Sequence, residues 1–119
     1  MKTILVVDDE EASAEVLGLI LEDEGYRVYT AANGMLGLDR AQEVRPSLVI
    51  LDFMMPVMRG DELGRRLREL PEFDGLKIIM NSSMPEDIVR ERFNGYDVFL
   101  RKPYDVEAAL KAIRKLIGR

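Results

Sequence analysis

Five short, mainly apolar runs alternate along the chain with longer segments in which apolar residues recur at helical spacing. The runs occupy residues 4–7, 27–31, 48–51, 76–80 and 97–100. Runs 4–7 and 48–51 are continuously apolar, which is typical of strands buried on both faces of a parallel sheet. Run 27–31 is more polar and alternates, as an edge strand does. The pattern predicts five strands.

The segments between the runs predict five helices. Their apolar stripes are Ala12, Val16, Leu17, Ile20 and Leu21; Met35, Leu38, Ala41 and Val44; Leu63, Leu67 and Leu70; Ile88, Val89 and Phe93; and Val106, Leu110, Ile113 and Ile117. Signals for helix ends stand at Gly25, Pro46, Pro71 and Asn94-Gly95. Asn33 and Asp105 suit helix N-termini, and the helix that starts near Pro85 is expected to be short.

Five strands that alternate with five helices favour a single α/β domain. Parallel neighbours need crossover connections, and these are right-handed, so helices cover both faces of the sheet. Placing the most apolar strands inside gives the strand order 2-1-3-4-5. We therefore expect a doubly wound, flavodoxin-like (βα)5 fold over residues 1–119.

Polar side chains stand where four of the predicted strands end. Asp8 and Asp9 follow the first strand, Asp52 the third, Ser82 the fourth and Lys102 the fifth. In a parallel sheet these ends share one edge, and ligands bind there. The sequence thus predicts a site with three acids, a hydroxyl and an amine.

Asp52 taken alone has a simpler explanation, a turn cap before Pro56. The neighbouring acids favour a chemical role, because two carboxylates about 4 Å apart repel by about 4 kcal/mol at an effective dielectric constant near 20. Such a cluster invites a divalent cation, and Mg²⁺ suits an oxygen site of few carboxylates better than Ca²⁺. A carboxylate can also attack phosphorus, so Asp52 is the candidate nucleophile.

Composition narrows the chemistry further. The 119 residues include no Cys and no His, which excludes thiolate zinc sites, cysteine nucleophiles and histidine bases. A net charge of −5 argues against direct binding of nucleic acid. No stretch approaches the ~20 apolar residues of a membrane span, so we expect a cytoplasmic protein without membrane contact.

These residues resemble the receiver domain of two-component response regulators over the whole chain. The matching motifs are Val6-Val7-Asp8-Asp9, Leu51-Asp52-Phe53-Met54-Met55-Pro56 with Gly60, Ser82, and Lys102-Pro103. The resemblance implies that Asp52 accepts a phosphoryl group from a sensor histidine kinase or a phosphotransfer protein. It further implies that Asp8 or Asp9, Asp52 and the backbone carbonyl of Met54 hold Mg²⁺.

The resemblance also implies a switch. In receivers the hydroxyl equivalent to Ser82 moves inward after phosphorylation, and an aromatic residue on the fifth strand, here Phe99, turns inward behind it. Simpler readings stay open: Phe99 as static packing, Lys102 as a solvated loop residue, and Ser82 or Ser83 as a cap of the following helix.

One departure concerns the output face, which in receivers comprises the fourth helix, the fifth strand and the fifth helix. The segment between Ser82 and Lys102 is about two residues shorter than the receiver pattern. We therefore expect the fourth helix to be trimmed or tilted. We also expect this face to bind a protein target, and weak dimerisation stays open.

The predicted function is a phosphoryl-accepting switch and not an enzyme. Two other functions are alternatives to it. A Mg²⁺-dependent phosphatase or nuclease could use the same acids, although no second acid follows Asp52 for acid-base work. A flavin or nucleotide carrier is opposed by the absence of a phosphate-binding Gly-rich or Ser/Thr-rich loop.

Overall fold

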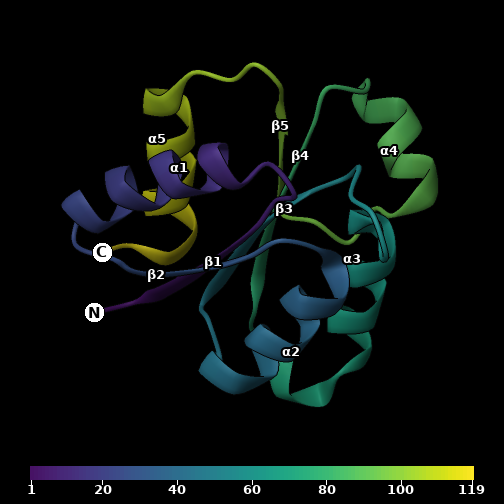
Figure 1. The fold of residues 1–119 in the computed structure, drawn as a ribbon, viewed down its shortest axis with the longest axis horizontal. Coiled ribbons are helices and arrows are strands. Elements are labelled where there is room, and N and C mark those ends of the chain that lie inside the picture. Colours follow the sequence, from purple (N-terminus) through teal and green to yellow (C-terminus); the bar gives the residue numbers. More distant parts are fainter.

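The computed structural model describes residues 1–119, and a five-stranded parallel sheet forms its centre (Figure 1). The strands are β1 (Thr3–Val7), β2 (Arg27–Ala31), β3 (Leu48–Asp52), β4 (Lys77–Ser82) and β5 (Val98–Arg101). They lie in the order β2-β1-β3-β4-β5, with β2 and β5 at the edges. The predicted fold and strand order are confirmed.

Five helices cover both faces of the sheet. They are α1 (Glu11–Asp23), α2 (Gly34–Val44), α3 (Gly60–Glu69), α4 (Glu86–Arg92) and α5 (Val106–Ile117). Figure 1 shows α1 and α5 on one face and the other three helices on the opposite face. A short 3₁₀ turn, Pro71–Phe73, follows α3 and was not predicted. No helix combines the length and the apolar character that a membrane span requires.

Successive residues of the central strands point to opposite faces, and this divides the core into two layers. Ile4 and Val6 of β1 pack into the layer beneath α1 and α5, whereas Leu5 and Val7 join the layer beneath α2, α3 and α4. Burying each such side chain stabilises the fold by about 1.5–3 kcal/mol. The continuous apolar runs of the sequence follow directly from this two-sided burial.

The predicted apolar stripes of four helices were partly wrong: Ile88 of α4 and Val106 of α5 are 40% and 38% exposed, and α1 and α2 depart further. Ala12 is exposed, Val16 is 57% exposed and Met35 is 45% exposed, although each was assigned to an apolar stripe. The buried side of α1 is instead formed by Ala14, Leu17, Gly18 and Leu21. Small residues at two of these positions let α1 approach the sheet closely, and apolar character alone did not identify them.

Two predicted helix starts are confirmed by their caps. The side chain of Asn33 accepts a hydrogen bond from the Leu36 amide at 2.9 Å, and that of Asp105 accepts one from the Glu107 amide at 3.3 Å. Such a cap typically stabilises a helix by about 1 kcal/mol.

The predicted short fourth helix is confirmed, since α4 has seven residues. The ring of Phe93, which follows it, lies between two glycines. A Cβ atom added to Gly64 would come within 2.6 Å of this ring, and one added to Gly95 within 2.7 Å. The absence of side chains at these positions makes the space that Phe93 fills.

Arginines of α3 form hydrogen bonds with the last residue of α4 and with the chain that follows it. Arg65 donates a hydrogen bond to the carbonyl of Arg92 at 2.6 Å. Arg68 donates to the carbonyl of Gly95 at 2.9 Å and pairs with Asp97 at 3.1 Å. The end of α4 is therefore held by α3 through polar as well as apolar contacts.

Candidate functional site

The predicted site residues meet at the carboxyl edge of the sheet. Asp8 directly follows β1, Asp52 is the last residue of β3, and Lys102 directly follows β5. Ser82 is the last residue of β4, which extends two residues beyond the predicted end of that strand. Strand pairing thus delivers all four side chains to one edge.

Three carboxylates form the floor and rim of the site. Asp8, Asp9 and Asp52 each offer an oxygen, and these oxygens lie within 4.8 Å of one another. Asp8 and Asp52 are 7% and 8% exposed, whereas Asp9 is open to solvent. The donor set fits Mg²⁺, which accepts carboxylate oxygens and keeps several water ligands.

Lys102 supplies the positive charge of the site. Its ammonium group donates a hydrogen bond to Asp52 Oδ2 at 3.1 Å and lies 3.5 Å from Asp8 Oδ2. Its backbone amide donates to the carbonyl of Ser82 at 2.8 Å, which fixes where the side chain starts. Lys102 is therefore a contact of the acidic cluster and not a solvated loop residue.

Burial and charge act against each other at Asp52. Burial raises the pKa of Asp52 above its usual range, although the hydrogen bond and charge of Lys102 oppose the rise. For Lys102, burial alone would lower the pKa, but Asp52 and Asp8 outweigh it and raise the pKa. Because the folded pKa of Asp52 exceeds the unfolded one, its ionised form opposes folding once the pH rises above the unfolded value. A bound cation would relieve this cost.

The structure distinguishes the two candidate serines. Ser82 is 1% exposed, and its hydroxyl oxygen accepts a hydrogen bond from the Met84 amide at 2.9 Å. Ser83 is exposed, and its carbonyl accepts a hydrogen bond from Arg101. Neither side chain caps α4, because its N-cap residue, Pro85, has no side-chain hydrogen bond.

Phe99 lies in β5 as the last member of a row of aromatic rings. The centroids of Phe93 and Tyr96 are 6.3 Å apart, and those of Tyr96 and Phe99 are 6.0 Å apart. The Tyr96 hydroxyl donates to Glu86 at 2.7 Å, at the start of α4. Tyr96 therefore joins Phe99 to α4, a role that the sequence analysis missed because helical and strand periodicity do not reveal contacts across a loop.

The loop after β3 is tied tightly to the sheet. Gly60 donates a backbone hydrogen bond to the carbonyl of Phe53 at 2.8 Å, and the Phe53 amide donates to Asn81 at 2.9 Å. A Cβ atom on Gly60 would come within 2.9 Å of the Cα atom of Phe53. Glycine at this position lets the start of α3 approach the backbone beside Asp52.

Asn81 is a second residue that the sequence analysis missed. It pairs with Asp52 in the register of β3 and β4, is 4% exposed, and has a side-chain oxygen without a hydrogen-bond partner. A buried unpaired acceptor costs about 1–3 kcal/mol. The available signal was a polar side chain directly after the apolar residues 78–80 of β4.

We expect the free energy of unfolding of the Asn81→Leu variant to be about 1 kcal/mol higher than that of the wild type, because the substitution removes this unpaired acceptor. Urea titration measures the change. The exposed Asn94→Leu variant is the matched control and should leave stability unaltered. A less stable Asn81→Leu protein would show that the amide is satisfied in solution.

Comparison with known proteins agrees with this geometry. The profile of the response regulator receiver domain matches residues 4–114. The chain belongs to the response regulator receiver domain family. As a receiver it is a phosphoryl-accepting regulator, and the match does not favour the phosphatase alternative.

Its curated relatives are longer proteins. The receiver is 39% identical over 118 residues to the phosphate regulon transcriptional regulatory protein PhoB of Rhizobium meliloti, covering 98% of this chain and 52% of that protein. It is 37% identical over 119 residues to the response regulator ArlR of Staphylococcus aureus, covering all of this chain and 54% of that protein. The chain thus spans about half the length of the curated relatives it matches.

Solved structures resemble the receiver along its full length. The chemotaxis response regulator CheY4 of Vibrio cholerae superposes with a TM-score of 0.90 at 30% identity, covering 98% of this chain and 99% of that one. The response regulator TrrA of Thermotoga maritima, solved in complex with Mg²⁺-BeF, has a TM-score of 0.89 at 32% identity, covering 98% and 100%.

Proposed function

We propose that Asp52 is the residue that accepts the phosphoryl group, within one receiver domain formed by residues 1–119. The observation that carries this proposal is the position of its carboxylate, which ends the central strand β3 and lies 3.1 Å from the Lys102 ammonium group. Asp52 is nearly buried and keeps 8% of its surface exposed at this edge of the sheet. The carboxylates of Asp8 and Asp9 stand beside it.

The transfer requires one new bond and one broken bond. A carboxylate oxygen of Asp52 attacks phosphorus, and the bond between phosphorus and the nitrogen of a donor phosphohistidine breaks, leaving its electron pair on that nitrogen. Lys102, now paired with Asp52 Oδ2, then faces an oxygen of the transferred group. The Ser82 hydroxyl, released from Met84, donates to another phosphoryl oxygen.

We assign the metal ligands to Asp8, Asp9, Asp52 and the backbone carbonyl of Met54. When bound there, Mg²⁺ neutralises charge that develops on the phosphoryl oxygens. The three carboxylates would repel one another less, and Lys102 balances the remaining negative charge.

The partners follow from the same proposal. A sensor histidine kinase or a phosphotransfer protein supplies the phosphoryl group, and the face made by α4, β5 and α5 binds a downstream protein. Phe99 changes its packing with Ser82 and reports the modification to this face. This function involves neither catalytic turnover of a substrate nor direct binding of nucleic acid, and its setting is the cytoplasm.

Incubation with Mg²⁺ and acetyl phosphate tests the function. Intact-mass spectrometry should detect one added phosphoryl group. The group should not appear when Mg²⁺ is chelated before acetyl phosphate is added. Sustained hydrolysis of an unactivated phosphoester by the protein would instead support the phosphatase alternative.

We expect Mg²⁺ to stabilise the receiver, because it relieves the repulsion among the three carboxylates. At a concentration ten times its Kd, the free energy of unfolding should rise by about 1.4 kcal/mol. Thermal unfolding at constant ionic strength measures this rise. The Asp8→Asn variant should lose most of it and the exposed Asp74→Asn variant should keep it; an equal rise in both variants would contradict the assigned ligands.

Tyr96 should restrain the short helix α4. The Tyr96→Phe variant loses the hydrogen bond to Glu86, so we expect backbone amides of α4 to exchange about fivefold faster, as for the loss of about 1 kcal/mol. Hydrogen exchange read by mass spectrometry measures this. Tyr29→Phe, which removes a hydroxyl from β2, is the control; unchanged exchange in α4 would rule out the restraint.

A further inference from the structure

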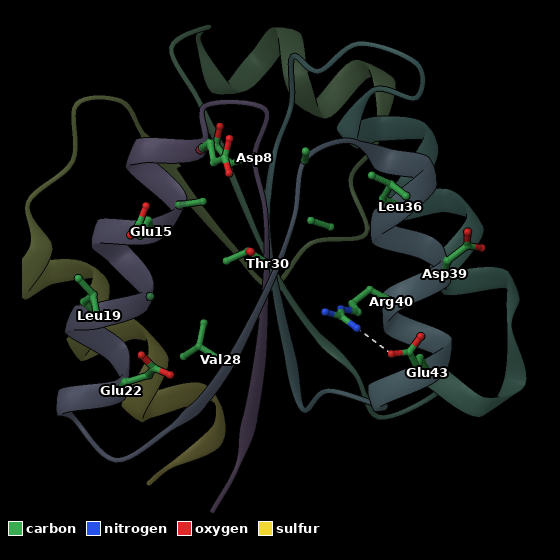
Figure 2. A pocket seen from close by; sticks show the side chains of 15 residues that line it. Asp8, Glu15, Leu19, Glu22, Val28, Thr30, Leu36, Asp39, Arg40 and Glu43 are labelled. Carbon is green, nitrogen blue, oxygen red and sulfur yellow. Dashed lines mark hydrogen bonds and ion pairs between the residues drawn. The ribbon is translucent and has the colours of Figure 1, made fainter.

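A groove of about 660 Å³ runs along the open edge of the sheet at β2, away from the output face. Because α1 and α2 cover opposite faces, their facing sides rise on either side of this edge strand. Figure 2 views the groove with α1 on the left, α2 on the right, and Val28 and Thr30 of β2 between them.

Apolar side chains line the groove from both helices. Leu19 of α1 is 62% exposed and Leu36 of α2 is 51% exposed, and both belong to its lining. Val28 of β2 is half-buried between them. Exposed leucines on facing helices give a binding partner an apolar surface to cover.

The rims of the groove are acidic. Glu15 and Glu22 of α1 stand opposite Asp39 and Glu43 of α2 (Figure 2). The single basic residue of the lining, Arg40, pairs with Glu43 at 2.7 Å and lies over the ring of Tyr29, 5.2 Å from its centroid. The groove therefore carries an excess of negative charge, because Arg40 is the only cation in a lining that holds six acids.

The floor offers backbone hydrogen-bonding groups. β2 pairs with β1 on one side and is the last strand on the other, so its outer edge has no strand partner. An extended peptide can add to such an edge, with main-chain hydrogen bonds giving affinity and alternate side chains giving specificity.

We propose that this groove binds an extended, lysine- or arginine-rich segment of a partner protein, which adds to β2 as a sixth strand. Successive residues of the added strand point to opposite faces, so each face carries apolar residues that cover Leu19 or Leu36 and basic residues that meet the acidic rim on that side. The open strand edge favours an extended segment over a helix, because a helix satisfies its own backbone groups. Phosphorylation of Asp52 is not required for this binding.

The test uses an acetylated, amidated seven-residue peptide in which pairs of valines and lysines alternate (VVKKVVK), so that each face of the strand carries both kinds of side chain. Fluorescence anisotropy of the labelled peptide should show saturable binding, and amide resonances of β2 (Arg27–Ala31) should shift on titration. The same peptide with N-methyl groups on alternate amides should bind at least about tenfold more weakly, because it cannot complete the strand ladder. Equal binding of both peptides would overturn strand addition.

Charge reversals test the acidic rims. The double variant Glu22→Lys, Glu43→Lys should bind the peptide about tenfold more weakly, whereas Glu72→Lys, Glu91→Lys, which alters exposed acids elsewhere, should bind as the wild type does. Equal weakening by the two variants, spermine competing as well as the peptide does, or shifts confined to Asp8, Asp9 and Asp52 would each overturn the proposal.

Discussion

The Asp52→Asn variant should gain no phosphoryl group when it is incubated with Mg²⁺ and acetyl phosphate. The amide keeps the size of the side chain but is a far weaker nucleophile, and it carries no charge to pair with Lys102. Intact-mass spectrometry should show complete loss of the modification that the wild type acquires. Amide resonances of β5 and α4 should also stop responding to beryllofluoride.

A matched substitution separates this effect from a general loss of acid groups. Asp74→Asn removes an exposed carboxylate and should be modified to the same extent as the wild type. Thermal unfolding should show that Asp52→Asn is folded, since the amide relieves the repulsion from Asp8. Full phosphorylation of the Asp52→Asn protein would contradict the assignment of Asp52 as the acceptor.

The Gly60→Ala variant should be less stable than the wild type by about 2–3 kcal/mol. Its new methyl group would overlap the backbone of Asp52 and Phe53, which are parts of the central strand and its loop and have little freedom to move. Chemical denaturation measures the loss of stability. Because the same overlap displaces the chain beside the acceptor, phosphorylation should slow as well.

Gly75→Ala is the control for this substitution, because no atom lies within 4 Å of the Cβ that it would add. We expect its stability to stay within about 0.5 kcal/mol of the wild type. Equal stability of the Gly60→Ala and Gly75→Ala variants would show that the loop after β3 adapts without cost.

The strands were predictable because burial on both faces imposes apolar residues at consecutive positions, as in residues 48–51. Strand order followed from the same cause, since the more polar run 27–31 could lie only at an edge. The face that each helix turns toward the sheet was harder to predict than the strand order. The helix α1 presents Ala14 and Gly18 to the sheet, and a stripe chosen by hydrophobicity alone favoured the exposed Val16 instead.

The site was predictable in outline because parallel strands end at a common edge, so Asp8, Asp52 and Lys102 had to meet. The hydrogen bond that turns the Ser82 hydroxyl toward Met84 depends on the local turn and has no signature in residue spacing. The unpaired oxygen of Asn81 depends on all the residues packed around it, so residue spacing along the chain does not predict it.

The packing of Phe93 between Gly64 and Gly95 holds the C-terminal end of α4 more firmly than its N-terminal end. Its C-terminal end is held by α3, whereas its N-terminal end is held by the hydrogen bond between Glu86 and Tyr96. In the switch proposed above, a displacement that begins at Ser82 would reach this N-terminal end first, and α4 would rotate about Phe93. The face proposed to bind a partner would then turn with the seven residues of α4 and would not slide along the sheet.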